Sequence, residues 1–149
     1  ITTSIIRDIS PRIERMQGYK DSLVSHGISV NSEYIKTVNA DEIPLALSEF
    51  FELEKPPQAI LAGNDIVLNE VLRYMKQHEI HIPDDIAVIG IDDVPYASFY
   101  TPTITTVNQP AIEMANLAAE LLLSQINKTG KEDTSVHRLK PTLLSRNSC

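Results

Sequence analysis

The chain has 149 residues, of which 42% are hydrophobic and 22% are charged, and its formal net charge is −7. This length and composition are typical of one globular domain, or of a large part of one, with a core of its own. The acidic balance argues against a surface that grips nucleic acid, because contacts to phosphate need clustered Lys and Arg.

No run approaches the roughly 18 apolar residues of a membrane-spanning helix, so we expect no membrane partner. The single cysteine, Cys149, rules out an internal disulfide and fits a reducing cytoplasm, where we expect the protein to work. Segment 1–6 reads like the end of a strand without its beginning, so we also expect further sequence upstream.

The first part of the chain alternates helices with short strands. Ser10-Pro11 marks a helix start, a capping hydroxyl followed by Pro at the first helical position, and Gly27 suits the end of that helix. A short strand is expected over 34–38. A second helix is expected after Asp41, and Pro56-Pro57 ends it.

The next elements repeat this order. Buried strands are expected over 59–62, 86–91 and 103–107, with a third helix that ends near His78. Strand and helix alternate at intervals of about 25 residues, and such apolar strands between amphipathic helices imply a parallel sheet covered on both faces. The sequence therefore predicts an α/β fold with a doubly wound parallel sheet.

The last part departs from this alternation. A long helix rich in Ala and Leu is expected from about 111 to 127, followed by a polar turn over 128–135. The final extended segment, 136–139 with 143–144, is interrupted at Pro141, which suggests a strand at the edge of the sheet.

Polar side chains follow three of the predicted strands. Asn39 follows the first, Asn64 with Asp65 the second, and Asp92 with Asp93 the third. The carboxyl ends of parallel strands meet at one edge, so we expect these groups to converge on a cleft. Amides and carboxylates together suit a ligand with several hydroxyl groups.

From the residues alone, several of these positions keep two interpretations. Asp65 is as well explained as a helix cap as by ligand contact, and Asp93 is better explained as a turn former. Asp92 is the stronger ligand candidate because it directly ends its strand. Arg15 on the first helix and Gln109 after the strand over 103–107 read as ordinary surface groups until further information is added.

Catalytic alternatives find little support. The five glycines are scattered, with no GxSxG elbow and no phosphate loop. His78 and His81 do not form an HExxH motif, so we expect no metal site. A phosphoacceptor domain would need a Lys after the strand over 103–107, and none follows. We expect neither an enzyme nor a cofactor.

Several short motifs occur in one order along almost the whole chain. They are Arg15-Met16-Gln17-Gly18-Tyr19, residues 59–67, Ile82-Pro83-Asp84-Asp85-Ile86, residues 87–93, Thr105-Thr106-Val107 with Gln109-Pro110, and the ending 143–148. Each is weak alone, but the ordered set resembles the C-terminal part of the effector-binding domain in the LacI/GalR family of bacterial transcriptional regulators. The terminal Arg-x-Ser is typical of the regulators rather than of their periplasmic relatives.

This resemblance implies a periplasmic-binding-protein-like fold of type I, in which two lobes enclose the ligand. Residues 1–107 would form most of the C-terminal lobe, with a truncated first strand. Residues 108–132 would be a crossover and a helix that belongs with the other lobe, and 133–149 would return to the first. Position by position, the family's effector contacts fall on Arg15, Asn64 or Asp65, Asp92 and Gln109.

The resemblance also implies a function. We expect the ligand-sensing fragment of a LacI-type repressor, with a small sugar-like effector as its partner and operator DNA reached only through a helix-turn-helix domain outside this chain. The alternative is a periplasmic sugar-binding protein of an ABC transporter. Residues 9–12 and 38–41 depart from the family's usual ligand contacts, so the identity of the effector does not follow.

Members of this family are homodimers. Phe99 and Tyr100, with the outer face of the helix over 66–77, match the contact region of the C-terminal lobe. Exposed aromatic side chains make reasonable interface anchors. From the sequence alone, the two rings are equally well explained as a cover for the edge of the sheet.

Overall fold

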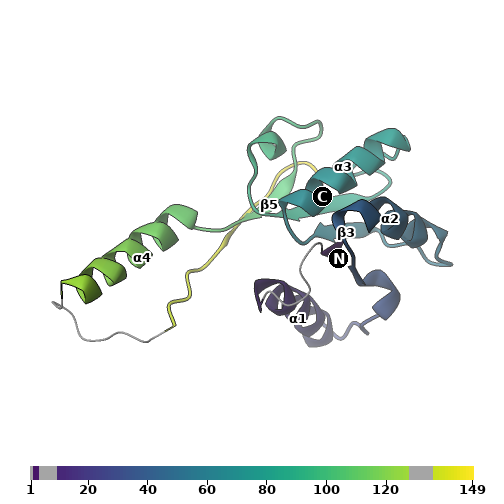
Figure 1. The fold of residues 1–149 in the computed structure, drawn as a ribbon. Coiled ribbons are helices and arrows are strands. Elements are labelled where there is room, and N and C mark those ends of the chain that lie inside the picture. The colour runs from purple at the N-terminus through teal and green to yellow at the C-terminus, as the bar shows by residue number, and fades with distance from the viewer. Residues whose placement is uncertain (1, 4–9, 128–135) are drawn as a thin grey trace.

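The computed structural model describes residues 2–3, 10–127 and 136–149, and these residues form one six-stranded sheet with helices on both sides (Figure 1). The strand order is β2-β1-β3-β4-β5-β6. The strands are β1 (Thr2–Thr3), β2 (Lys36–Thr37), β3 (Ala59–Ala62), β4 (Ala87–Ile91), β5 (Thr105–Asn108) and β6 (Thr142–Leu144). The helices are α1 (Ser10–Ser25), α2 (Ile43–Glu52), α3 (Asp65–Gln77) and α4 (Ala111–Ile126), with 3-10 turns η1 (Ser32–Tyr34), η2 (Ala40–Glu42) and η3 (Pro95–Ser98).

The strands from β1 to β5 run parallel, and β6 runs antiparallel to β5 at the edge of the sheet. The register pairs Ala62 of β3 with Gly90 of β4, and Ile91 of β4 with Val107 of β5. The carboxyl ends of these three strands therefore lie at one edge of the sheet. This confirms the predicted doubly wound α/β fold, with one antiparallel strand added.

One face of the sheet carries the main hydrophobic core. Ile60 and Val88 point from β3 and β4 into a cluster with α2 and α3, where Leu47, Phe50 and Leu68 are buried. α3 approaches β4 so closely that a Cβ placed on Gly90 would lie 2.6 Å from Leu68 Cδ2. A side chain at position 90 would therefore force the buried Leu68 side chain to move.

The opposite face is covered less tightly. α1 lies on that side in Figure 1, and a cavity of about 320 Å³ separates Tyr19 of α1 from Leu61 of β3 and Ile89 of β4. Every residue of α1, all of which the structure describes, is exposed or half-buried.

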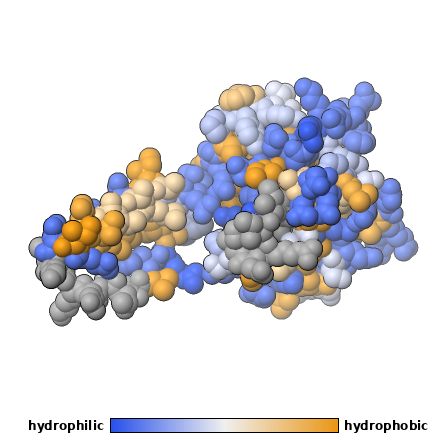
Figure 2. All heavy atoms as spheres, viewed as in Figure 1, coloured by the Kyte–Doolittle hydropathy of each residue, from blue (hydrophilic) through white to orange (hydrophobic). Residues whose placement is uncertain are grey.

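α4 stands away from the sheet as an arm (Figure 1). The chain reaches it from Asn108 at the end of β5 and returns through residues 136–141 to Thr142, which pairs with Asn108. All residues of this helix are described, and none is buried. Its apolar side chains are conspicuous in Figure 2, and Ile112 is 79% exposed. Among the described helices, none is long and apolar enough to cross a membrane.

Most predicted elements are confirmed within a few residues of their expected ends. One expectation is wrong: residues 136–139 are not a strand, and the edge strand consists of Thr142–Leu144 alone. Of the expected first strand, the described part is Thr2–Thr3, which lies between β2 and β3. The polar turn predicted over 128–135 lies outside the described residues.

Candidate ligand-binding site

The end of β4 presents Asp92 at the carboxyl edge of the sheet. Its φ angle is +80°, a left-handed conformation that Asp tolerates better than most residues. The backbone holds this geometry, since the Asp92 N–H donates to Val107 O at 3.0 Å and the Val94 N–H donates to Asp92 O at 3.1 Å. The Asp92 carboxylate accepts a hydrogen bond from the side-chain amide of Gln109.

Asp93, the next residue, is exposed at the same edge, but its side chain faces β5 and the segment after β6. Its Oδ1 accepts a hydrogen bond from Thr106 Oγ1 at 2.7 Å and lies 2.8 Å from Arg146 Nη1. The hydrogen bond from Arg146 is the main cause that lowers the pKa of the Asp93 carboxyl below its usual value. The two neighbouring acids therefore have different surroundings, because Asp93 is neutralised by Arg146 and Asp92 is held by an uncharged amide.

Arg15 reaches the same edge from α1. Its Nη1 donates to Gly63 O, directly after β3, at 2.8 Å. Arg15 and Gln109 both line a cavity of about 420 Å³, whose walls are largely apolar and include Val107 of β5 and Met114 of α4. A guanidinium beside an apolar wall suits a ligand that has both hydroxyl groups and C–H surfaces.

A second, adjoining hollow of about 370 Å³ is lined by Asp92, Asp93 and Asn108. Gln109 and Met114 line both hollows. Arg15 and Asp92 thus line two different hollows, and Gln109 lines both of them at the carboxyl edge of the sheet.

The other predicted contacts occupy different positions. Asn64 is 7% exposed and caps α3, because its Oδ1 accepts from the Val67 N–H at 2.9 Å. The cap of α3 is therefore Asn64 and not Asp65. Asp65 is exposed in the first turn of α3, where its backbone oxygen accepts from Tyr96 Oη at 3.2 Å. Neither residue lines the two hollows described above.

Asn39 likewise takes part in a local hydrogen bond at the start of a short helical turn. Its N–H donates to Glu42 Oε2 at 2.8 Å at the start of η2. Of the strand-end groups expected to converge on one cleft, Asp92 and Asp93 line the hollow at the end of β4, whereas Asn39, Asn64 and Asp65 line neither hollow.

Two residues near the site, Arg146 and Met114, were not among the predicted contacts. The register of β5 with β6 brings the segment after β6 back along β5, and this places Arg146 Nη1 3.0 Å from Thr106 Oγ1. Met114 reaches the site because α4 begins immediately after Gln109-Pro110. The terminal Arg-x-Ser motif contains Arg146, but nothing in the sequence connects that residue with Asp93.

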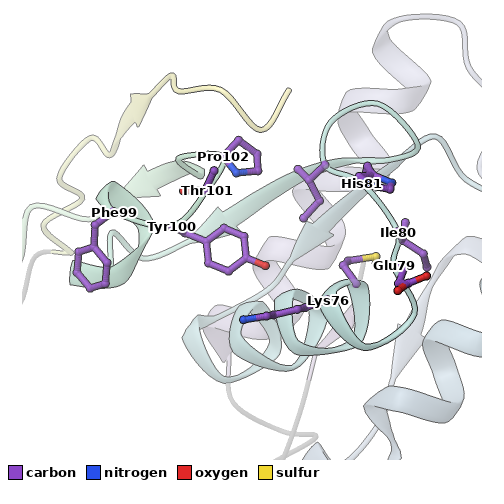
Figure 3. A pocket seen from close by; sticks show the side chains of 10 residues that line it. Lys76, Glu79, Ile80, His81, Phe99, Tyr100, Thr101 and Pro102 are labelled. Atoms are coloured by element: carbon purple, nitrogen blue, oxygen red, sulfur yellow. The ribbon is translucent and has the colours of Figure 1, made fainter.

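A separate groove of about 800 Å³ lies away from this site, between the end of α3 and residues 99–102 (Figure 3). Phe99 is 73% exposed, whereas Tyr100 packs against the core and its hydroxyl donates to Leu72 O at 3.4 Å. Burial raises the pKa of the Tyr100 phenol. Lys76, Glu79 and His81 supply the polar part of the groove.

No cluster of His, Cys, Asp or Glu with the geometry of a metal site occurs among the described residues. The groups gathered at the sheet edge can donate and accept hydrogen bonds and can balance one charge with another, which is the chemistry of ligand recognition.

Comparison with known proteins identifies the family of this chain. Residues 4–149 match the family model described as a periplasmic binding protein-like domain. The protein named "Probable HTH-type transcriptional regulator EndR" from Paenibacillus polymyxa is 43% identical over 94% of this chain and 42% of its own length. The ribose operon repressor of Escherichia coli K12 is 32% identical over 95% of this chain and 43% of its own length.

Among solved structures, the transcriptional regulator CelR in complex with cellobiose superimposes with a TM-score of 0.87 and 27% sequence identity. The match covers 99% of this chain and 46% of that chain. This chain therefore spans less than half the length of the proteins that it resembles here.

Proposed function

The chain belongs to the periplasmic binding protein-like domain family, and from this premise we propose that it is the effector-sensing part of a LacI-type bacterial transcriptional regulator. One relative is named an HTH-type transcriptional regulator and another an operon repressor, which favours a regulator over a periplasmic transport protein. They are not enzymes, and we assign this chain no catalytic role. As a regulator it would work in the cytoplasm and reach operator DNA through a separate domain.

The observation that carries this proposal is the meeting of Asp92, Gln109 and Arg15 at the carboxyl edge of the sheet. A carboxylate accepts from ligand hydroxyls, an amide both donates and accepts, and a guanidinium donates in a fixed fork. Neutral sugars match this set. The cellobiose bound to CelR and the name of the ribose operon repressor support the same class of ligand. Asn64 and Asp65 remain proposed contacts, to be reached by a ligand that extends past the end of β3.

In this proposal the chain supplies one lobe and part of a second. The first lobe would comprise residues 1–107 and 133–149, and residues 108–132 would be the crossover and a helix that belongs with the other lobe. The exposed apolar side chains of α4 support this arrangement, because an arm of this composition gains stability when a partner surface covers it. Ligand bound between two lobes would favour one relative arrangement of them, and the DNA-binding domains would sense that shift.

We also propose that the groove beside Phe99 and Tyr100 is a contact with a second copy of the protein. An exposed Phe at the rim of an apolar groove is a suitable anchor for a symmetric interface. Tyr100 would form part of the groove wall on the side of the core, since it packs against the core.

Calorimetric titration of the full-length protein with D-ribose, cellobiose and sucrose tests the proposed ligand class. An effector sensor is supported if at least one sugar binds and if that sugar changes, in either direction, the affinity of the protein for operator DNA. No heat with any of a broad set of neutral sugars contradicts a sugar effector. A signal peptide in place of a helix-turn-helix ahead of this chain would favour the transport protein instead.

A further inference from the structure

Arg146 lies directly behind the proposed sugar site and touches three groups of β5 and its surroundings. Its Nη1 lies 2.8 Å from Asp93 Oδ1, 3.0 Å from Thr106 Oγ1 and 2.7 Å from Ile104 O. The Arg146 side chain is 19% exposed and that of Asp93 is 26% exposed. The ion pair is therefore partly shielded from water, and a charge-assisted hydrogen bond in such a place is stronger than a fully exposed one.

The backbone that carries Arg146 is itself firmly held. Its own N–H donates to Thr105 Oγ1 at 2.9 Å, and the Asn147 N–H donates to Thr103 O at 3.0 Å. Ser148 is fully buried, accepts from the Val88 N–H through its backbone oxygen at 2.9 Å, and accepts from the Thr105 N–H through its hydroxyl at 2.8 Å. The guanidinium thus projects from a segment tied to both β4 and β5.

Asp93, the partner of Arg146, is the middle residue of the turn that shapes Asp92. The turn is closed by the hydrogen bond from the Val94 N–H to Asp92 O, and it leaves Asp92 at φ +80°. A non-glycine residue keeps this conformation only when its surroundings impose it. The described hydrogen bonds of the Asp93 side chain come from Thr106 and Arg146, so these two groups fix the turn from its inner side.

We propose that Arg146 is a positioning residue for effector binding: it holds Asp93 against β5 and thereby fixes the turn that presents the Asp92 carboxylate to Gln109 and to the sugar. The effect of Arg146 on sugar affinity rests on the proposed function. Its effect on the conformation of Asp92 can be measured without any ligand. The lowered pKa of Asp93 agrees with it, since that carboxyl stays ionised and paired at neutral pH.

The test uses the full-length protein with the variants Arg146→Met, Arg146→Lys and Asp93→Asn. Lys36→Met is the matched control, because it removes the ion pair of Lys36 with Glu49 at the opposite edge of the sheet. Each variant is measured by calorimetry with D-ribose, cellobiose and sucrose and by thermal unfolding, and the crystal structure of Arg146→Met without ligand is determined.

We expect Arg146→Met to weaken sugar binding about tenfold, as the loss of one charged hydrogen bond would. The loss should be much smaller when Asp92→Asn is already present, because Arg146 acts through Asp92. Arg146→Lys should restore part of the affinity, since a lysine can still pair with Asp93 but cannot hold Ile104 O and Thr106 together with it. Lys36→Met should bind sugar as the unaltered protein does.

A merely structural role gives a different result. If Arg146→Met and Asp93→Asn lower the unfolding temperature and leave the affinity unchanged, the inference is wrong. It is also wrong if the ligand-free Arg146→Met structure keeps Asp92 at φ +80° and bonded to Gln109. Should Arg146→Met fail to fold, the affinities of Arg146→Lys and Asp93→Asn decide. If the unaltered protein binds no sugar, the proposed function fails, and the position of Asp92 in the variant structure still decides the inference.

Discussion

The side-chain amide of Gln109, after β5, donates a hydrogen bond to the carboxylate of Asp92, after β4. The two strands are parallel neighbours, and Ile91 pairs with Val107, so the residues that follow them meet at the carboxyl edge of the sheet. The pair combines a group that only accepts with one that both donates and accepts. A sugar hydroxyl beside this pair would find an acceptor in the second carboxylate oxygen of Asp92 and a donor in the second amide hydrogen of Gln109.

This relationship predicts the effect of removing the two charged groups of the site. Asp92→Ala and Arg15→Ala should each weaken sugar binding by about 100-fold or more, because each loses charge-assisted hydrogen bonds to the ligand. The unfolding temperature should stay close to that of the unaltered protein. Calorimetry on the full-length protein measures the affinity, with Asp85→Ala as a control, since Asp85 is exposed and pairs with His81 instead. If both variants bind sugar with unchanged affinity, Asp92 and Arg15 are not part of the binding site.

Packing between α3 and β4 predicts a large difference between two glycine substitutions. Gly90→Ala places a Cβ 2.6 Å from Leu68 Cδ2 in the core, and overpacking of this kind typically destabilises by about 1–3 kcal/mol. Gly18→Ala, in α1, meets no atom within 4 Å and should stabilise by about 0.5–1 kcal/mol through its helix propensity. Urea unfolding of the two variants gives the comparison. Equal stabilities would show that the Leu68 side chain can move away from position 90 at little cost.

The fold could be predicted from the sequence because its signals are local. Continuous apolar runs such as 87–91 and the caps and breakers around the helices specify the elements and their order. The strand over 136–139 was predicted wrongly. Of its four residues only Val136 is β-branched, and His137 and Arg138 are polar, so the segment has little strand propensity. In the structure that segment connects α4 to the edge of the sheet, and pairing begins only at Thr142.

The site could be predicted only in part. Asp92 follows from its place at a strand end, and Arg15 and Gln109 needed the family resemblance. The difference between Asp92 and Asp93 depends on Arg146, which is far along the chain and reaches Asp93 only through the antiparallel pairing of β5 with β6. A contact set by register between distant segments leaves no periodic pattern in the sequence.

The pairing of Asp93 with Arg146 predicts a pH dependence of stability. The Asp93 pKa is lowered from 3.8, first by the hydrogen bond from Arg146. A carboxyl with a lower pKa in the folded state contributes stability that is fully present above its unfolded pKa and is lost as the pH falls through its folded pKa. The unfolding temperature of the unaltered protein should therefore exceed that of Asp93→Asn at neutral pH, and the difference should shrink below 3.8. A difference that stays constant during acidification would contradict this account.

The exposed ring of Phe99 predicts how the proposed dimer can be separated. A symmetric interface places each anchor against the same surface of the other copy, so one substitution acts twice. Phe99→Asp puts two charges into that contact and should convert the full-length protein from dimer to monomer, with an unchanged fold by circular dichroism, because the side chain is 73% exposed in the single chain. Leu45→Asp is the control: Leu45 is 64% exposed on α2, does not line the groove, and its substitution should leave the dimer intact. Sedimentation velocity distinguishes the two states. If both variants remain dimeric, the copies meet through another surface, and Phe99 and Tyr100 serve only to cover this side of the lobe.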